Sequence, residues 1–187
     1  MIQVITSLGN PGPDYETTRH NAGWILIDAL AKQLGATWRN ETQFQAMVAK
    51  AEVEGKKVWL VKPMTYMNLS GESVQSFLSF YKYKPEQMLL VHDEVAFESG
   101  KFKISSVGSA GGHNGVADVI ERLGTEEFWR FRLGTGPRNP LLTLTEWVLG
   151  HLSKGEQSWL ASKELINTLV LIVDKGPAIV QNNLNLS

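Results

Sequence analysis

The sequence predicts a single α/β domain over residues 1–187, in which helices flank a twisted, mixed and largely parallel sheet. Short segments rich in apolar and β-branched residues alternate with longer segments whose apolar residues recur at helical spacing. No internal repeat, low-complexity tract or long Pro- or Ser-rich linker separates two cores. With 43% hydrophobic and 20% charged residues, the chain is long enough to bury one full core.

Four short segments are predicted as strands. Each is rich in apolar or β-branched residues and is followed within a few positions by Gly, Pro, Asn or Asp, the residues that commonly end strands. The predicted strands are residues 2–8, 58–61, 88–92 and 131–133.

Helices are predicted where apolar residues recur at i, i+3 and i+7. Three such segments are residues 24–34, 74–81 and 116–123. Gly35 and Gly124 follow the first and the third segment and are good helix stops. Ser70 is the expected N-cap of the second helix, and Asn114 precedes the third. The same spacing over residues 159–173 predicts one long C-terminal helix that ends near Gly176.

Composition and charge exclude several classes of protein. The chain has no cysteine, which rules out disulfides, thiolate metal sites and Cys nucleophiles. Its formal net charge is −1 and its pI is about 6.4. Such a balance argues against a protein that coats nucleic acid by bulk positive charge, so any contact with RNA must be a local patch.

The sequence shows no targeting or membrane-spanning segment. Its start lacks a basic region followed by a long apolar run and a small-residue cleavage site, so no signal peptide is expected. The longest apolar stretch, residues 165–173, contains Asn167 and Thr168 and is far shorter than the roughly 20 residues of a membrane helix. We expect a soluble, cytoplasmic protein without membrane contact.

Polar residues gather at one predicted edge of the sheet. In α/β sheets, ligands bind beyond the carboxyl ends of the strands, because helix N-termini and flexible loops converge there. The residues at the end of a predicted strand or near the start of a predicted helix are Asn10, His20, Asn68, Asp93 and Asn114. We expect these side chains to share one site.

His20 is the candidate general base of this site. Its unperturbed pKa of about 6.5 suits proton abstraction near neutrality. A histidine becomes a convincing base when a carboxylate holds its tautomer, and Asp93 could supply that carboxylate. In the alternative interpretation, His20 is a surface or capping residue and Asp93 begins a solvated loop.

Other motifs also have two interpretations. Asn10 lies in an Asn-Pro-Gly sequence that commonly forms a plain turn. Met67 could pack in the core or line a site. The Gly-rich residues 108–115 lack the ending of a P-loop and the spacing of a dinucleotide fingerprint. The four histidines lack metal-site spacing such as H-E-x-x-H, so the sequence predicts neither a cofactor nor a metal.

Basic residues in the second half of the chain are candidates for a phosphate-binding patch. Alternate residues of a strand share one face, which would group some of their charges. The candidates are Lys101, Lys103, Arg130, Arg132 and Arg138. The alternative is an ordinary solvated face.

Taken together and in order, the motifs resemble those of the bacterial peptidyl-tRNA hydrolase family. They are Gly9-Asn10-Pro11-Gly12, Tyr15, Thr18-Arg19-His20-Asn21, Pro63-Met64-Thr65-Tyr66-Met67-Asn68 with Ser70-Gly71, His92-Asp93-Glu94 and Gly111-Gly112-His113-Asn114-Gly115. The combination is specific, although each motif alone is weak. The resemblance implies the family's α/β fold and a monomer. It also implies hydrolysis, without metal or cofactor, of the ester between a peptidyl or N-blocked aminoacyl group and the terminal ribose of tRNA.

The resemblance further implies roles for single residues. His20 would activate water as general base, Asp93 would orient His20 and stabilise its charged form, and Asn10 would separate blocked from unblocked aminoacyl-tRNA. Contacts with the tRNA end or the peptide are implied for Tyr15, Tyr66, Met67, Asn68, His113, Asn114, Lys103 and Arg132.

The chain departs from the family's usual pattern in two loops and in the segment Leu133-Gly134-Thr135-Gly136-Pro137-Arg138. Val95-Ala96-Phe97-Glu98 stands where members usually carry a more acidic, proline-containing loop, and Ser105-Ser106-Val107 replaces basic or glycine residues. These changes bear on the binding of tRNA phosphates and not on the hydrolytic centre. Two other classes stay open: a noncatalytic RNA-binding relative, and a small-molecule esterase or aminopeptidase on a similar sheet.

Overall fold

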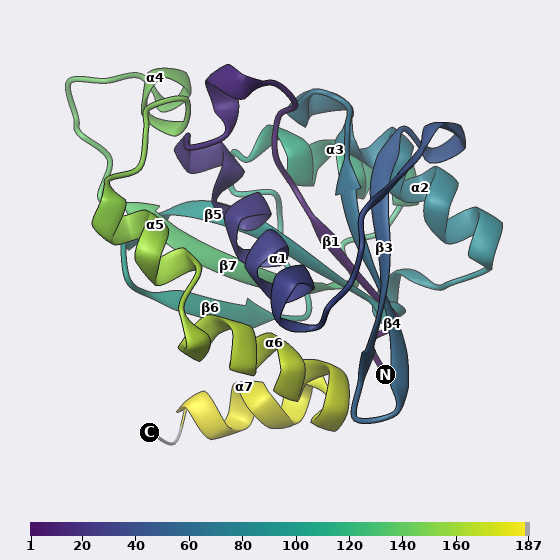
Figure 1. Ribbon diagram of the computed structural model, residues 1–187. Helices are drawn as coiled ribbons and strands as arrows, with labels where there is room; N and C mark the ends of the chain where they lie inside the picture. Colours follow the sequence, from purple (N-terminus) through teal and green to yellow (C-terminus); the bar gives the residue numbers. More distant parts are fainter. Residues whose placement is uncertain (186–187) are drawn as a thin grey trace.

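The computed structural model describes residues 1–185 and contains a seven-stranded sheet with helices on both faces (Figure 1). The strand order is β2-β3-β4-β1-β5-β7-β6. Four central strands pair in parallel: β4 (Lys56–Pro63), β1 (Val4–Ser7), β5 (Met88–Glu98) and β7 (Trp129–Gly136). Antiparallel pairing adds β2 (Arg39–Glu41), β3 (Ala46–Val53) and β6 (Phe102–Ser105). The predicted α/β class with a mixed, largely parallel sheet is confirmed.

The helices cover the sheet in two layers, each with its own buried cluster. One cluster joins the sheet to α1 (Ala22–Gln33), α5 (Lys154–Leu160), α6 (Lys163–Lys175) and α7 (Pro177–Asn185). The other joins it to α2 (Ser70–Tyr81) and α3 (Asn114–Leu123). Strands buried on both faces carry continuous apolar runs, as in residues 88–91 of β5, all of which are buried. The two layers leave the strand ends free for a site.

The antiparallel hairpin of β3 and β4 is absent from the predicted strands, apart from residues 58–61. Its two-residue turn is Glu54-Gly55, and both residues have a positive φ, of 49° and 74°. A turn of this kind matches the twist of the strands, but Glu-Gly is a weaker signal than Asn-Gly or Asp-Gly. The turn residues therefore gave only a weak sequence signal for this hairpin.

Strand β5 extends further than residues 88–92, so the prediction that Asp93 follows the strand is wrong. Asp93 and Glu94 pair with Leu133 and Gly134 of β7, and the pairing becomes irregular only between Glu94 and Glu98. Asp93 is thus held by strand pairing on a rigid element. This position favours a fixed side chain over a loop residue.

Two helix predictions need correction. Ser70 is the first residue of α2 and not its N-cap, and its hydroxyl donates to the carbonyl of Met67. Residues 159–173 do not form one helix, because a first break at residues 161–162 separates the end of α5 from α6, and Ser162 caps α6 through the N–H of Leu165. A second break at Gly176 precedes α7, which was not predicted. The apolar spacing continues across the first break because both helices pack on the same buried cluster.

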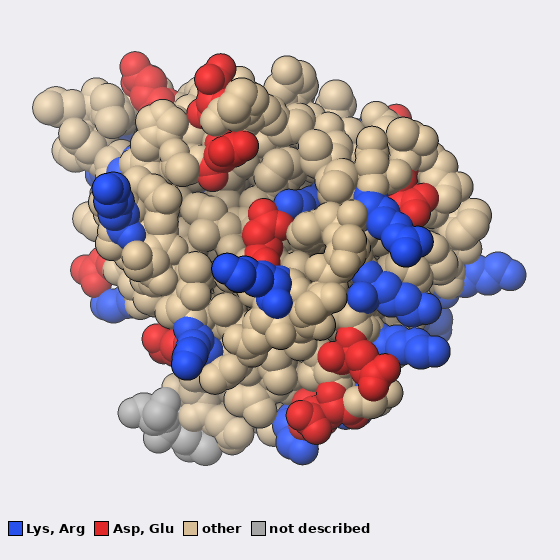
Figure 2. Space-filling model, in the orientation of Figure 1, with Lys and Arg blue, Asp and Glu red and all other residues tan. Residues whose placement is uncertain are grey.

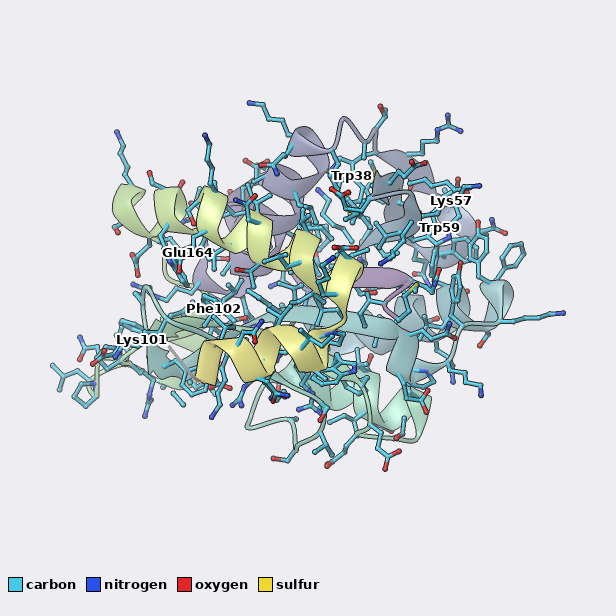
Figure 3. The ribbon with its side chains drawn as sticks, turned by 90° about the horizontal axis from the view of Figure 1, so that it is seen from below. Trp38, Lys57, Trp59, Lys101, Phe102 and Glu164 are labelled. Carbon is cyan, nitrogen blue, oxygen red and sulfur yellow. The ribbon has the colours of Figure 1, made fainter. Side chains whose placement is uncertain are left out.

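Helix α7 covers the edge strand β6. Seen from below, α6 and α7 lie side by side, and Lys101 and Phe102 lie beside α7 (Figure 3). Gln181 of α7 donates from Nε2 to the carbonyl of Ile104, at 2.8 Å, which satisfies part of the exposed strand edge. Within residues 1–185, no helix has both the length and the apolar content that crossing a bilayer requires.

Candidate functional site

Two adjoining cavities lie near the carboxyl ends of β1 and β4, toward the top of Figure 1, beside α4 (Leu144–Val148) and the start of α3. Their volumes are about 210 and 330 Å³. Both are lined by His20, Asn114, Thr145 and Val148. The first also includes Asp93 and His113, and the second includes Asn10, Tyr15, Tyr66, Met67 and Asn68. The structure therefore brings together all five residues of the predicted sheet edge.

His20 and Asp93 form a buried pair. His20 lies in the short 3-10 helix η2 (Arg19–Asn21), which leads directly into α1. Its Nδ1 atom is 2.9 Å from Oδ1 of Asp93. His20 is 7% exposed and Asp93 is 2% exposed. A buried carboxylate stays ionised only when it is hydrogen-bonded or paired, and here the imidazole supplies both interactions.

The same oxygen of Asp93 has a second histidine partner. Nε2 of His113 is also 2.9 Å from Oδ1 of Asp93, and the rings of His20 and His113 have centroids 4.7 Å apart. Within the described chain, Oδ2 of Asp93 has no hydrogen-bond partner. Both histidines thus converge on one carboxylate oxygen.

These contacts shift the pKa values of the pair in opposite directions. Burial acts to raise the pKa of Asp93, but its electrostatic interactions and hydrogen bonds with His20 and His113 outweigh burial and hold the pKa well below its usual range. Burial acts to lower the pKa of His20, but the charge of Asp93 and its hydrogen bond outweigh it, so the net pKa is raised. Asp93 therefore stabilises the protonated form of His20.

A third histidine lies behind the pair. The His92 ring meets the edge of the His113 ring, with centroids 4.9 Å apart. Nδ1 of His92 donates to the backbone carbonyl of Asp93, at 2.7 Å. Burial, together with the neighbouring His113, lowers the pKa of His92 to about 3. His92 is therefore neutral near physiological pH.

His20, Asp93 and His113 offer nitrogen and oxygen atoms within 4.8 Å of one another, a set that transition metals can use. However, Nδ1 of His113 accepts the N–H of Val116, at 3.2 Å, as N-cap of α3. A metal on Nε2 would leave this ring with no proton on either nitrogen, which neutral imidazole cannot provide. The cluster fits hydrogen bonding better than metal ligation.

Asn10 is held in one orientation by the backbone around it. Its side-chain oxygen accepts the N–H of Met67 at 2.8 Å. Its own N–H and C=O are both paired with the side chain of Asn21, at 2.9 Å each. Since the oxygen is engaged, the amide Nδ2 group is the part of Asn10 that remains available to a ligand. Asn21 was not among the predicted site residues, although it follows His20 directly.

The other amides and the tyrosines line the more open cavity. Asn68 and Asn114 are exposed, and neither side chain has a hydrogen-bond partner within residues 1–185. Tyr66 is 60% exposed, whereas Tyr15 is half-buried and Met67 is buried. Free amide donors beside aromatic rings form a surface suited to carbonyl, ribose and base groups.

The predicted patch of cations is only partly present. Arg130 is 3% exposed, donates to the carbonyls of Gly108 and Ser109, and stacks on Phe128, so its assignment to a phosphate-binding surface is wrong. Burial of its guanidinium against these carbonyls explains why the strand-face argument failed.

The remaining cations differ in availability. Arg132 binds Glu94 at 2.7 Å, and Lys101 binds Glu98 at 2.7 Å. Lys103 is exposed. Its backbone lies opposite that of Arg132 in the antiparallel register of β6 and β7, so these two side chains share one face of the sheet. Figure 2 shows acidic and basic side chains interspersed on the visible face, with no continuous positive band.

Helix α4 forms a wall of both cavities, and the sequence analysis did not identify it. Leu144, Thr145 and Val148 line the cavities. The guanidinium of Arg19 lies 3.8 Å from the centroid of the Trp147 ring, and the indole N–H of Trp147 donates to the carbonyl of Thr135, at 3.1 Å. The wall is therefore fixed to the residue that precedes His20. No local sequence signal marks this contact, because it joins segments about 130 residues apart.

Comparisons with known proteins point to one family. A family model described as peptidyl-tRNA hydrolase matches residues 4–186. A peptidyl-tRNA hydrolase of Bordetella petrii is 53% identical over 160 residues, covering 84% of this chain and 76% of that protein. One from Caldicellulosiruptor bescii is 47% identical over 157 residues, covering 84% and 82%.

Solved structures show the same relationship. The crystal structure of peptidyl-tRNA hydrolase from Acinetobacter baumannii has a TM-score of 0.89 with this chain and 36% sequence identity. The match covers 97% of this chain and 93% of that one. Sequence and fold thus resemble the same group of proteins over nearly the whole chain.

Proposed function

This chain belongs to the peptidyl-tRNA hydrolase family and hydrolyses the ester bond of peptidyl-tRNA, and we propose that His20 is the general base of the reaction. The observation that supports this role is the buried 2.9 Å contact between His20 Nδ1 and Asp93 Oδ1 at the cavity wall. Since Asp93 accepts a hydrogen bond from Nδ1–H, the lone pair of Nε2 is the basic site.

The proposed reaction follows from this tautomer. Nε2 of His20 removes a proton from water while the water oxygen attacks the ester carbonyl carbon. Asp93 stabilises the imidazolium that forms. When the tetrahedral intermediate collapses, the ribose oxygen leaves and takes the proton from Nε2, which yields the free peptide and free tRNA. A positioned base of this kind is worth roughly 10² to 10⁴ in rate.

Side-chain amides are the proposed partners of the developing oxyanion and the peptide. Asn68 and Asn114 have free amide groups and line the cavity beside His20. A preorganised donor of this type contributes roughly 10²- to 10³-fold. Asn10 offers its Nδ2 group at a fixed orientation, which suits the proposed discrimination between blocked and unblocked aminoacyl groups.

Recognition of the tRNA end is assigned to the rim of the cavities. Tyr15 and Tyr66 offer rings for stacking on the unpaired acceptor end, and Met67 follows Tyr66 directly in the chain. Lys103 and Arg132 are the proposed phosphate contacts, of which Lys103 is the unpaired one within the described residues. Because the substrate is a product of translation, we also propose a cytoplasmic location. The family resemblance is the basis on which we propose a monomeric enzyme.

The wall formed by α4 should affect substrate binding more than chemistry. We expect Trp147→Ala to raise KM about 2- to 30-fold, the range that a cation–π contact of roughly 0.5–2 kcal/mol represents, with kcat nearly unchanged. Trp147→Phe keeps a ring beneath Arg19 and loses only the indole N–H bond, so it should have a smaller effect. Steady-state kinetics on both variants tests this, and a fall in kcat at constant KM would contradict it.

The substrate assignment is tested with a defined ester. Purified protein should release the acyl group from N-acetylated aminoacyl-tRNA faster than from the unblocked form, and deacylated tRNA should compete. Tight RNA binding without turnover would indicate a noncatalytic relative. Hydrolysis that deacylated tRNA does not inhibit would indicate a small-molecule esterase.

A further inference from the structure

His113 lies at the centre of a cluster of three histidine rings. Its ring centroid is 4.7 Å from that of His20 and 4.9 Å from that of His92. Its side chain is 8% exposed. The ring therefore has close neighbours on both sides and little contact with solvent.

Both nitrogens of His113 are already engaged inside the protein. Nδ1 accepts the N–H of Val116 and caps the N-terminus of α3, so Nδ1 carries no proton. The proton of the neutral ring is then on Nε2, which donates to Oδ1 of Asp93 at 2.9 Å. The N-cap thus fixes the tautomer, and the tautomer fixes the bond to Asp93.

The bond from His113 limits how Asp93 can move. Oδ1 accepts from His20 on one side and from His113 on the other, and the carboxylate is buried. A rotation of the carboxylate that broke one bond would leave a buried donor unpaired, which is costly. The start of α3 therefore bears directly on the orientation of His20.

We infer that His113 is a positioning residue for the His20–Asp93 pair, held in a single tautomer by the N-terminus of α3, and not a hydrogen-bonding contact for the substrate. The inference rests on the proposed function, and it replaces the substrate contact that the family resemblance implies for His113. It follows from the engagement of both ring nitrogens, which leaves neither of them for a ligand.

No other charged group near His20 within the described residues takes the place of Asp93 as its partner. Besides His20, the titratable groups that line the same cavities are Asp93, Glu94, His113, Tyr15 and Tyr66. Glu94 is paired with Arg132, and the guanidinium of Arg19 stacks on Trp147. Asp93 alone carries a negative charge in contact with His20 among the described residues.

The tautomer can be measured without an activity assay. The chain has four histidines, so long-range ¹H–¹⁵N NMR spectra of the wild-type imidazoles can be assigned with single His variants. We expect His113 to show a protonated Nε2 and an unprotonated Nδ1. An Nδ1–H tautomer, or exchange between the two tautomers, would overturn the inference.

Two substitutions separate the cap from the bond to Asp93. His113→Asn keeps an oxygen that can cap α3 but is too short to donate to Asp93. We expect kcat to fall about tenfold, the factor of one charge-assisted hydrogen bond, with KM within twofold of wild type. With one donor fewer on Asp93, the pKa of His20 should rise, and the acidic limb of kcat/KM should move to higher pH.

His113→Gln is the reciprocal control, because its Nε2 can reach Asp93 while the cap is weakened. It should retain the pH profile and most of kcat but have a lower melting temperature. If His113→Asn raised KM and left kcat and the pH profile unchanged, His113 would be a substrate contact, and the inference would be refuted. If the wild type failed to hydrolyse peptidyl-tRNA, the NMR titration of His20 in the wild type and in His113→Asn would still test the positioning role.

Discussion

Substitution of His20 by glutamine should lower kcat/KM for N-acetylated aminoacyl-tRNA about 10²- to 10⁴-fold while the protein stays folded. Glutamine fills a similar volume and can still donate to Asp93, but it has no group that takes a proton from water near neutrality. Water without a base is a poor nucleophile, so the loss should appear mainly in kcat. Single-turnover hydrolysis of the labelled ester measures the effect.

A matched control distinguishes loss of the base from general disturbance of the fold. His151 is exposed, and within residues 1–185 its side chain bonds only to the hydroxyl of Thr17, so His151→Gln should hydrolyse at nearly the wild-type rate. Thermal unfolding of both variants should remain cooperative. Full activity of a folded His20→Gln variant would rule out His20 as the base and leave the site without a proton acceptor.

The location of the site could be predicted because the site residues lie at the ends of predicted strands or near the starts of predicted helices. His20 precedes an amphipathic helix, and Asn114 opens another, so their common edge follows from the alternation of strands and helices. Asp93 was assigned to the right edge for a partly wrong reason, since β5 continues through it. Its side chain is more rigidly placed than a loop residue would be.

Features that depend on distant contacts could not be predicted. The α4 wall is held by Arg19, and the tautomer of His113 depends on the backbone of α3 and on a carboxylate 20 residues away. Arg130 has the residue type of a phosphate ligand, but its guanidinium is buried against backbone carbonyls. Composition and periodicity indicate which residues are present on an element. They do not determine which polar groups pair across the fold.

Asp93→Asn should separate the charge of Asp93 from its geometry. Both groups that point at Oδ1 are donors, so an asparagine with its oxygen in the same place can accept from His20 and His113. Its Nδ2 group would replace Oδ2, which has no partner within residues 1–185. The tautomer of His20 should survive, and what disappears is the negative charge beside the ring.

The loss of that charge should lower kcat/KM and lower the pKa of His20. An opposite charge in contact shifts a pKa by about 1–3 units, or roughly 1.4–4 kcal/mol, so kcat/KM should fall about 10- to 10³-fold as the imidazolium loses this stabilisation. The pKa of His20 is raised because Asp93 outweighs burial, so in the variant burial acts unopposed. The acidic limb of kcat/KM should therefore move to lower pH.

Asp93→Ala should be worse than Asp93→Asn, because it also removes the acceptor that fixes both histidines. In a double-mutant cycle with His20→Gln, the two losses should be far from additive, since Asp93 acts only through His20. Additive losses would mean that Asp93 contributes independently of His20. An acidic limb that stayed in place in Asp93→Asn would show that the group titrating in the profile is not paired with this carboxylate.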